Sequence, residues 1–241
     1  DAQALSRIWS KETNKNGYTY NFSWLGRPII QYPQDILAMQ ELIWTIQPDL
    51  IIEMGIAHGG SLIFSASMLE LNAVCGGPKD AMILGVDLDI RKHNKEAIES
   101  HPMSKRINMI QGSSIEHEVI EQVHKFAQNK ETILIILDSN HTHEHVLAEL
   151  NAYTSLVSPG SYCIVFDTLI EDMPGDLEIR ASFNGPIERI RRLQPHEPHT
   201  SLGCELCVDQ NQVPQLEELK KIINTWVRRI QSSHLSNYDK L

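Results

Sequence analysis

Five short apolar runs constrain the fold of this chain more than any other feature of its sequence. The runs cover residues 50–56, 83–89, 107–112, 132–139 and 161–168. Helical patterns follow the first four of them, at 59–72, 91–100, 115–128 and 144–157. Strands that are apolar throughout and alternate with helices are typical of a parallel sheet covered on both faces. We therefore predict an α/β fold: a Rossmann-like, doubly wound, mostly parallel sheet with helices on both faces.

The two ends of the chain lie outside this alternating pattern. Residues 1–33 are rich in aromatic and turn residues, and we expect them to form a cover or lid at one end of the sheet. Residues 34–241, which begin with a helical pattern at 35–46, are expected to form a single domain. Its part from 175 to 241 diverges from the alternation, with a possible strand at 204–209 and an amphipathic helix at 214–231.

The composition and charge of the chain argue against nucleic acid and membrane as partners. A net charge of −10 argues against a nucleic-acid-binding surface, which needs clustered Lys and Arg. No apolar stretch reaches the roughly twenty residues that span a bilayer, so we expect a cytoplasmic protein without membrane contact. Cys204 and Cys207 have CxxC spacing, but no second such pair completes a zinc site. The expected partners are a small-molecule substrate and further copies of the chain in a homo-oligomer.

Polar residues recur where the apolar runs end, which is where open parallel sheets bind ligands. The first run ends in EMGIAHGGS, whose glycine spacing differs from the GxGxxG turn that binds a diphosphate. Glu53 would repel a diphosphate but attract an α-amino group, and Asp87 can accept the hydroxyls of a ribose. A ligand with a ribose, a positive charge and no diphosphate suggests S-adenosylmethionine; alternatively, the glycines only close a tight turn. The cofactor-binding candidates are Glu53, Gly55, Gly59, Ser61, Asp87, Gly112, Ser113 and Ser114.

Asp138 and Asp167 close the fourth and fifth runs and should lie side by side at the carboxyl edge of the sheet. Two carboxylates are costly to bury unless they are solvated or bind a cation, and hard oxygen ligands favour Mg²⁺ or Ca²⁺. A divalent ion there would lower the pKa of an acceptor hydroxyl. The alternative is that Asp138 only caps the helix that follows it.

Three histidines follow Asp138 in the stretch DSNHTHEH. His141 can take the proton of an acceptor hydroxyl as a general base, since the pKa of imidazole is near neutral pH. A zinc site is disfavoured because His143-Glu144-His145 lacks the HExxH frame, and because His143 and His145 do not share a helix face. His143 and His145 are therefore predicted to be solvent-facing or packing residues.

Three stretches of the chain resemble the cephalosporin hydroxylase family, whose members have the class I methyltransferase fold. They are WLGRPIIQYPQDI, PDLIIEMGIAHGGSLIFSASML and DSNHTHEHVLAELNAYTSLVSPGSYCIVFDTLIEDMP. The resemblance implies S-adenosylmethionine and Mg²⁺ as cofactors, with metal ligation by Asp138 and Asp167. The spacing from Asp138 to His141 is similar to that between metal ligand and general base in catechol O-methyltransferase. Macrolide sugar O-methyltransferases likewise use a histidine in this region.

The sequence departs from this family at the end of the fifth run. Relatives often carry two acidic residues there, whereas this chain has Phe166-Asp167, so Glu171, Asp172 or water would complete a metal shell. We predict an S-adenosylmethionine-dependent, divalent-metal-assisted O-methyltransferase that acts on a hydroxyl of a small molecule, sugar or natural product. Two alternatives stay open: an oxidoreductase or hydroxylase, and a non-catalytic cofactor-binding relative.

Overall fold

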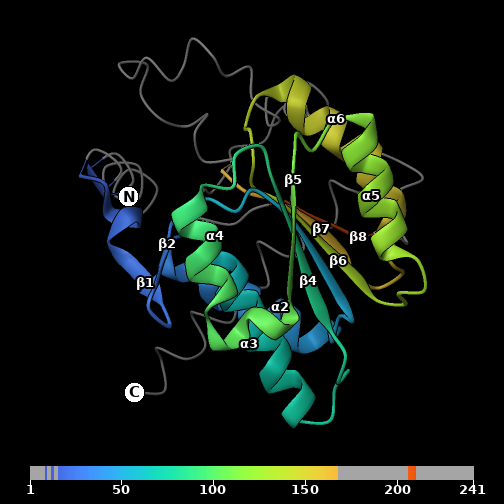
Figure 1. Ribbon diagram of the computed structural model, residues 1–241, viewed down its shortest axis with the longest axis horizontal. Coiled ribbons are helices and arrows are strands. Elements are labelled where there is room, and N and C mark those ends of the chain that lie inside the picture. The colour runs from blue at the N-terminus through green and yellow to red at the C-terminus, as the bar shows by residue number, and fades with distance from the viewer. Residues whose placement is uncertain (1–8, 10–11, 14–15, 168–205, 210–241) are drawn as a thin grey trace, which may run out of the picture.

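A six-stranded sheet forms the centre of the computed structural model, which describes residues 9, 12–13, 16–167 and 206–209 (Figure 1). The strand order is β5-β4-β3-β6-β7-β8, and all neighbours are parallel except β7 and β8, which are antiparallel. This arrangement confirms the predicted mostly parallel sheet. The strands are β3 (Leu50–Met54), β4 (Met82–Asp87), β5 (Ile107–Gln111), β6 (Ile133–Leu137), β7 (Tyr162–Val165) and β8 (Leu206–Asp209).

Helices cover both faces of the sheet, as predicted (Figure 1). One face carries α2 (Pro33–Ile46), α3 (Gly60–Val74) and α4 (Lys92–Glu99), and the other carries α5 (His117–Ala127) and α6 (His143–Tyr153). Three short 3₁₀ helices join these elements: η1 (Tyr18–Asn21), η2 (Pro102–Arg106) and η3 (Thr154–Leu156). No helix in the described part of the chain combines the length and apolarity needed to cross a bilayer.

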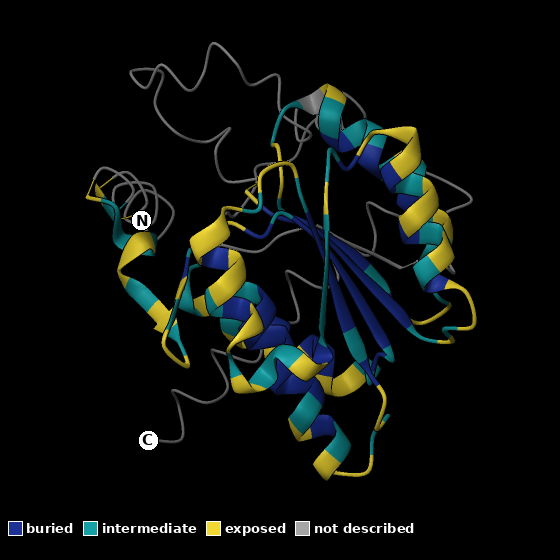
Figure 2. Cartoon of the chain, in the orientation of Figure 1, coloured by how far each residue is buried: buried dark blue, intermediate teal, exposed yellow. Residues whose placement is uncertain are grey.

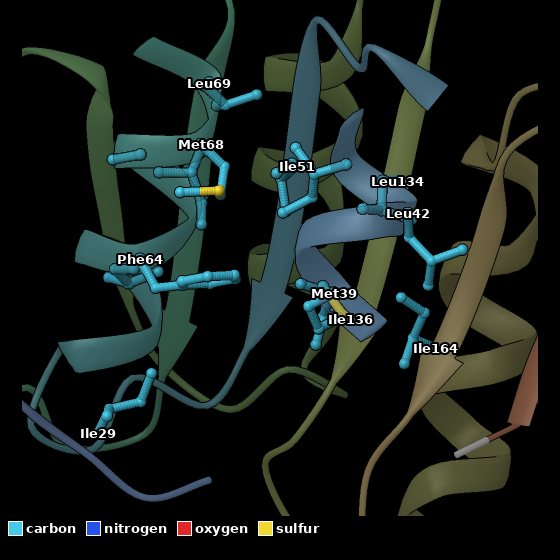
Figure 3. Close-up of a cluster of buried hydrophobic side chains, with 14 of the residues drawn as sticks. Ile29, Met39, Leu42, Ile51, Phe64, Met68, Leu69, Leu134, Ile136 and Ile164 are labelled. Atoms are coloured by element: carbon cyan, nitrogen blue, oxygen red, sulfur yellow. The ribbon is translucent and has the colours of Figure 1, made fainter. Parts of the chain in front are cut away.

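The apolar runs of the sequence feed two separate cores, because successive strand residues point to opposite faces. Ile51 packs with α2 and α3, whereas its neighbours Leu50 and Ile52 pack on the side of α5 and α6. Figure 3 shows the first of these clusters, and Figure 2 shows the strands as a mostly buried layer between the helices. Helices thus shield both faces of the central strands from water, which explains why the sequences of these strands are continuous apolar runs.

A two-stranded hairpin, β1 (Phe22–Trp24) and β2 (Arg27–Ile29), packs against α3. The Trp24 ring meets Phe64 edge-on with centroids 4.9 Å apart, and its indole N–H donates to the Ser67 hydroxyl at 3.0 Å. The start of α3 approaches β2 so closely that a Cβ at Gly60 would overlap the carbonyl of Pro28. Residues 22–31 therefore lie against the turn that follows β3.

The predicted elements between residues 35 and 167 are all present, with strands one to four residues shorter than the apolar runs. The possible strand at 204–209 is confirmed as β8. The amphipathic helix predicted at 214–231 lies outside the described residues. The division at 33/34 and the divergent part from 175 onwards stay predictions.

Candidate active site at the carboxyl ends of the strands

Backbone hydrogen bonds join the carboxyl ends of β3, β4 and β6, at the residues that directly follow β3 and β6. The amide of Gly55 donates to the Val86 carbonyl at 2.8 Å, and the amide of Asp138 donates to the Met54 carbonyl at 2.8 Å. Gly55 has φ 102°, and a Cβ there would overlap the carbonyl of Asp138. Only glycine therefore lets the first turn pass directly beside the end of β6.

Glu53 is the fourth residue of β3 and points toward α2 and α3, the same face as Ile51. It is 1% exposed, and its carboxyl accepts a hydrogen bond from the Ser61 hydroxyl at the start of α3. Burial raises the pKa of Glu53 to about 7, although the bond from Ser61 acts in the opposite direction. Within the described residues, the second carboxyl oxygen, Oε2, has no hydrogen-bond partner. This buried acceptor lies beside the glycine turn, which is the turn between β3 and α3 at residues 55–60, and it suits a cationic donor.

Asp87, at the end of β4, accepts hydrogen bonds from backbone amides of the neighbouring turns. Oδ2 accepts from Ile56 at 2.7 Å and from Ala57 at 3.1 Å, and Oδ1 accepts from Asp89 at 3.0 Å. A carboxylate offers about four acceptor positions, so these bonds leave about one for a ribose hydroxyl. Asp87 therefore holds the glycine turn in shape, a role that the sequence reading did not foresee.

The remaining cofactor candidates lie on the turns after β3 and β5. Gly59, with φ 82°, is the residue before α3 and packs against Ile98. Gly112 follows β5 and donates its amide to the Asp87 carbonyl at 2.9 Å. Ser114 is 5% exposed, and its hydroxyl is directed inward to the carboxylate of α6 residue Glu149 at 2.5 Å. The eight predicted cofactor residues thus lie at the carboxyl ends of β3 and β4 and on the segments that follow β3 and β5.

Asp138, His141 and Asp167 form a group whose ligand atoms all lie within 4.8 Å of one another. The predicted neighbourhood of the two aspartates is confirmed, and His141 joins them: its Nε2 lies 2.9 Å from Asp167 Oδ2. Asp167 has φ 63°, an uncommon conformation for a residue with a side chain. The alternative role of Asp138 as a helix cap is wrong, because Thr142 is the residue before α6.

Burial and four acidic neighbours raise the pKa of Asp138 well above its usual range. Besides burial, the causes in decreasing order are the charges of Asp167, Glu53, Asp35 and Glu149. The side-chain amide of Gln31 donates a hydrogen bond to Oδ2 of Asp138 at 2.9 Å. The donor set of two carboxylates and one imidazole, with this excess of negative charge, fits a divalent cation.

Gln31 and Asp35 belong to this site although the sequence reading did not identify them. Asp35 lies in the first turn of α2 and is 5% exposed; burial, followed by the charge of Asp167, raises its pKa to about 7. A cleft lined by Gln31, Asp35, Glu53, Ser61, Asp138 and Phe166 brings these elements together. An acid in the first turn of a helix is ordinary, because it complements the helix dipole, so its position alone gave no signal of a site.

The other candidate metal ligands and the other histidines after Asp138 differ in whether the structure describes their side chains. Glu171 and Asp172, candidate substitutes for an acid at Phe166, lie outside the described residues, as does the side chain of His143. His145 lies on α6 with its side chain 16% exposed and contacts the hydroxyls of Ser114 and Ser139, so it is a packing residue in a polar cluster.

Comparison with known proteins identifies relatives of this site and fold. Rhamnosyl O-methyltransferase of Mycobacterium tuberculosis is 27% identical over 197 residues, which are 80% of this chain and 70% of that protein. The Mycobacterium leprae protein of the same name is 28% identical over 153 residues, or 63% of this chain and 62% of that one. The fold is similar to that of CalS11, a TDP-rhamnose 3′-O-methyltransferase of calicheamicin biosynthesis. The TM-score is 0.52 at 17% identity, covering 73% of this chain and 78% of that chain.

A family description agrees with these relatives. Residues 16–205 match the model described as Rhamnosyl O-methyltransferase/CmcI, which confirms the resemblance to the cephalosporin hydroxylases. The matched range contains the hairpin, the glycine turn, Asp138, His141 and Asp167. The chain therefore belongs to the rhamnosyl O-methyltransferase/CmcI family.

Proposed function

We propose that this protein transfers a methyl group from S-adenosylmethionine to a hydroxyl of a sugar or another small natural product. The observation that carries this proposal is the convergence of Asp138, His141 and Asp167 beside the glycine turn in a member of this family. The names of the mycobacterial relatives point to a sugar hydroxyl as acceptor.

The segments that follow the strands have separate binding roles in this proposal. Glu53 and the glycine turn hold the α-amino end of the cofactor, and the turns after β4 and β5 hold its nucleoside. Asp138 and Asp167 hold a divalent cation such as Mg²⁺. When bound, S-adenosylmethionine supplies the methyl group and leaves as a neutral thioether, while the cation supplies Lewis acidity that lowers the pKa of the acceptor hydroxyl.

His141 removes the proton from the acceptor hydroxyl. Its Nε2 faces the Asp167 carboxylate at 2.9 Å, which sets this nitrogen as the protonated one in the neutral ring. Nδ1 is then the basic nitrogen and receives the proton as the acceptor oxygen bonds to the methyl carbon and the carbon–sulfur bond breaks. Asp167 also stabilises the imidazolium that results, as a carboxylate does beside a catalytic histidine.

Residues 22–31, within the predicted cover 1–33, close one side of this site in our proposal, because Gln31 donates to Asp138 from the segment that follows β2. The segment therefore belongs to the acceptor side rather than serving only as hydrophobic cover. A cytoplasmic location and assembly into a homo-oligomer stay predictions from the sequence.

Calorimetry with S-adenosylmethionine and with NAD, each with and without Mg²⁺, tests the assignment directly. We expect binding of S-adenosylmethionine, and Mg²⁺ binding that Asp138→Asn abolishes. Binding of NAD with no response to S-adenosylmethionine would favour the oxidoreductase alternative and overturn the proposal. A matched test is His141→Ala, which should abolish methyl transfer while leaving cofactor affinity nearly unchanged; loss of both would make His141 structural.

One observation favours a second candidate, a cofactor-binding relative without turnover. Phe166 is 6% exposed and lines the cleft beside Asp138, at a position where relatives often carry an acid. If the cation site were incomplete, the protein would bind S-adenosylmethionine but show no response to Mg²⁺. Phe166→Glu would then restore Mg²⁺ binding, whereas a complete site predicts that this variant gains little.

A further inference from the structure

A buried polar cluster on α6 connects the turn after β5 with the turn after β6. Its centre is Glu149, which is fully buried. Glu149 Oε1 accepts hydrogen bonds from the Ser114 hydroxyl at 2.5 Å and from the Ser139 hydroxyl at 2.6 Å. Ser114 belongs to the turn assigned to the cofactor, and Ser139 directly follows Asp138. One carboxylate oxygen therefore fixes both halves of the site.

His145 reinforces the same connection from one helical turn earlier. Its Nε2 lies 3.3 Å from Glu149 Oε1, 3.0 Å from the Ser114 hydroxyl and 3.3 Å from the Ser139 hydroxyl. The Tyr153 hydroxyl donates to the Ser114 carbonyl. Side chains from three successive turns of α6 thus hold these two segments.

The geometry does not correspond to a Ser-His-acid nucleophile. In such a triad the serine and the acid contact opposite ring nitrogens of the histidine. Here one nitrogen, Nε2, faces both serines and the acid, and each serine also donates directly to Glu149. The cluster is therefore suited to holding positions rather than to forming a covalent intermediate.

A second His–Glu pair shows that the buried environment, not the pairing itself, is special. His117 and Glu121 on α5 have the same i,i+4 spacing and the same 3.3 Å separation, but their side chains are 85% and 68% exposed. An exposed pair of this kind contributes little to stability. Burying Glu149 is costly unless its oxygens are bonded, and within the described residues its Oε2 has no partner. A carboxyl group buried at that cost points to a role other than stability.

We propose that Glu149 is a positioning residue that couples cofactor binding to cation binding. Ordering of the Ser114 turn by the cofactor is transmitted through the Glu149 carboxylate to Ser139, and so to the adjacent Asp138. Cation binding at Asp138 strengthens cofactor binding by the same factor, as linkage requires. This inference rests on the proposed function, because it names the two ligands that the cluster connects.

The experiment is a calorimetric titration of the full chain with S-adenosylhomocysteine, with and without Mg²⁺. For the unaltered protein we expect Mg²⁺ to tighten binding about tenfold, within the usual range of coupling between sites. Glu149→Gln and Ser139→Ala should reduce this factor to less than about twofold. Ser139→Thr keeps the hydroxyl and should keep the coupling, and Glu121→Gln, the matched exposed variant, should leave it unchanged.

The outcomes separate this inference from the function on which it rests. Full coupling in both Glu149→Gln and Ser139→Ala, or no coupling in the unaltered protein that binds both ligands, would overturn the positioning role alone. Failure of the unaltered protein to bind either ligand would overturn the proposed function. If Glu149→Gln does not fold, Ser139→Ala provides the same test on its own.

Discussion

Asp87 is the last residue of β4 and Asp138 directly follows β6, the two strands that flank β3, but their surroundings are opposite in character. Asp87 accepts three backbone amide hydrogen bonds from the turns beside it. Asp138 accepts a hydrogen bond from the Gln31 amide, and burial, followed by the carboxyl groups around it, raises its pKa. One half of the site is therefore complete without a ligand, whereas the other concentrates negative charge. A cation would therefore stabilise the half that contains Asp138. Substitutions in the two halves should change stability and ligand binding differently.

The largest effect is expected for Asp138→Asn. Loss of this carboxylate should abolish Mg²⁺ binding and slow methyl transfer roughly a thousandfold, or about 4 kcal/mol of transition-state stabilisation. Single-turnover methyl transfer and a Mg²⁺ titration measure the two effects. Asp80→Asn, at an exposed position before the amino end of β4, is the control and should change neither. Ordinary turnover of Asp138→Asn would remove the cation from the proposed chemistry.

A smaller effect is expected where the two halves touch, at Gly55. In Gly55→Ala the new Cβ would overlap the Asp138 carbonyl in addition to taking a positive φ, so unfolding should become easier by about 3 kcal/mol. Gly76→Ala has a similar φ of 99° but no neighbour near the new Cβ, and should cost only about 1 kcal/mol. Denaturant unfolding of both variants compares them; equal losses would mean that the strand ends can separate.

Asp35→Asn should stabilise the metal-free protein by about 2 kcal/mol at pH 8. The pKa of Asp35 is raised from 3.8 to about 7, so its contribution to stability is fully present below about pH 4 and lost as the pH rises through 7. Asn cannot ionise, and the gain of the variant should therefore vanish near pH 4. Thermal unfolding from pH 4 to 8 measures this; a gain that is constant with pH would refute the electrostatic cause.

The smallest effect is expected for Asp87→Asn, which should destabilise the protein, whereas Asp35→Asn should stabilise it. An amide can replace only part of the acceptor capacity of the carboxylate, so one or more backbone amides of the glycine turn lose a partner. We expect a loss of about 1 kcal/mol in the free energy of unfolding in the same experiments. Stabilisation by Asp87→Asn would place this residue with the charged half of the site.

The sheet and the positions of its carboxyl ends were predictable because they depend on the spacing of apolar and polar residues over short stretches of sequence. An apolar run with an acid at its end, such as the one that closes with Asp138, determines both a buried strand and the place of a polar group. Gln31, Asp35 and Glu149 were not predictable from the same rules. Asp35 and Glu149 look like ordinary acids on helices, and Gln31 like an ordinary residue after a strand. Their roles come from contacts over 107 residues, as for Gln31 and Asp138, or over 35, as for Ser114 and Glu149.

The contact between Trp24 and α3 makes the indole a spectroscopic probe of the hairpin. Its N–H is bonded to the Ser67 hydroxyl and its ring lies edge-on to Phe64, which also lines the cleft that contains Asp138. Release of the hairpin would expose this indole to water and shift its emission to longer wavelength. The fluorescence of Trp24, with Trp9, Trp44 and Trp226 replaced by phenylalanine, would thus report in real time whether the hairpin that leads to Gln31 stays in place while ligands enter and leave.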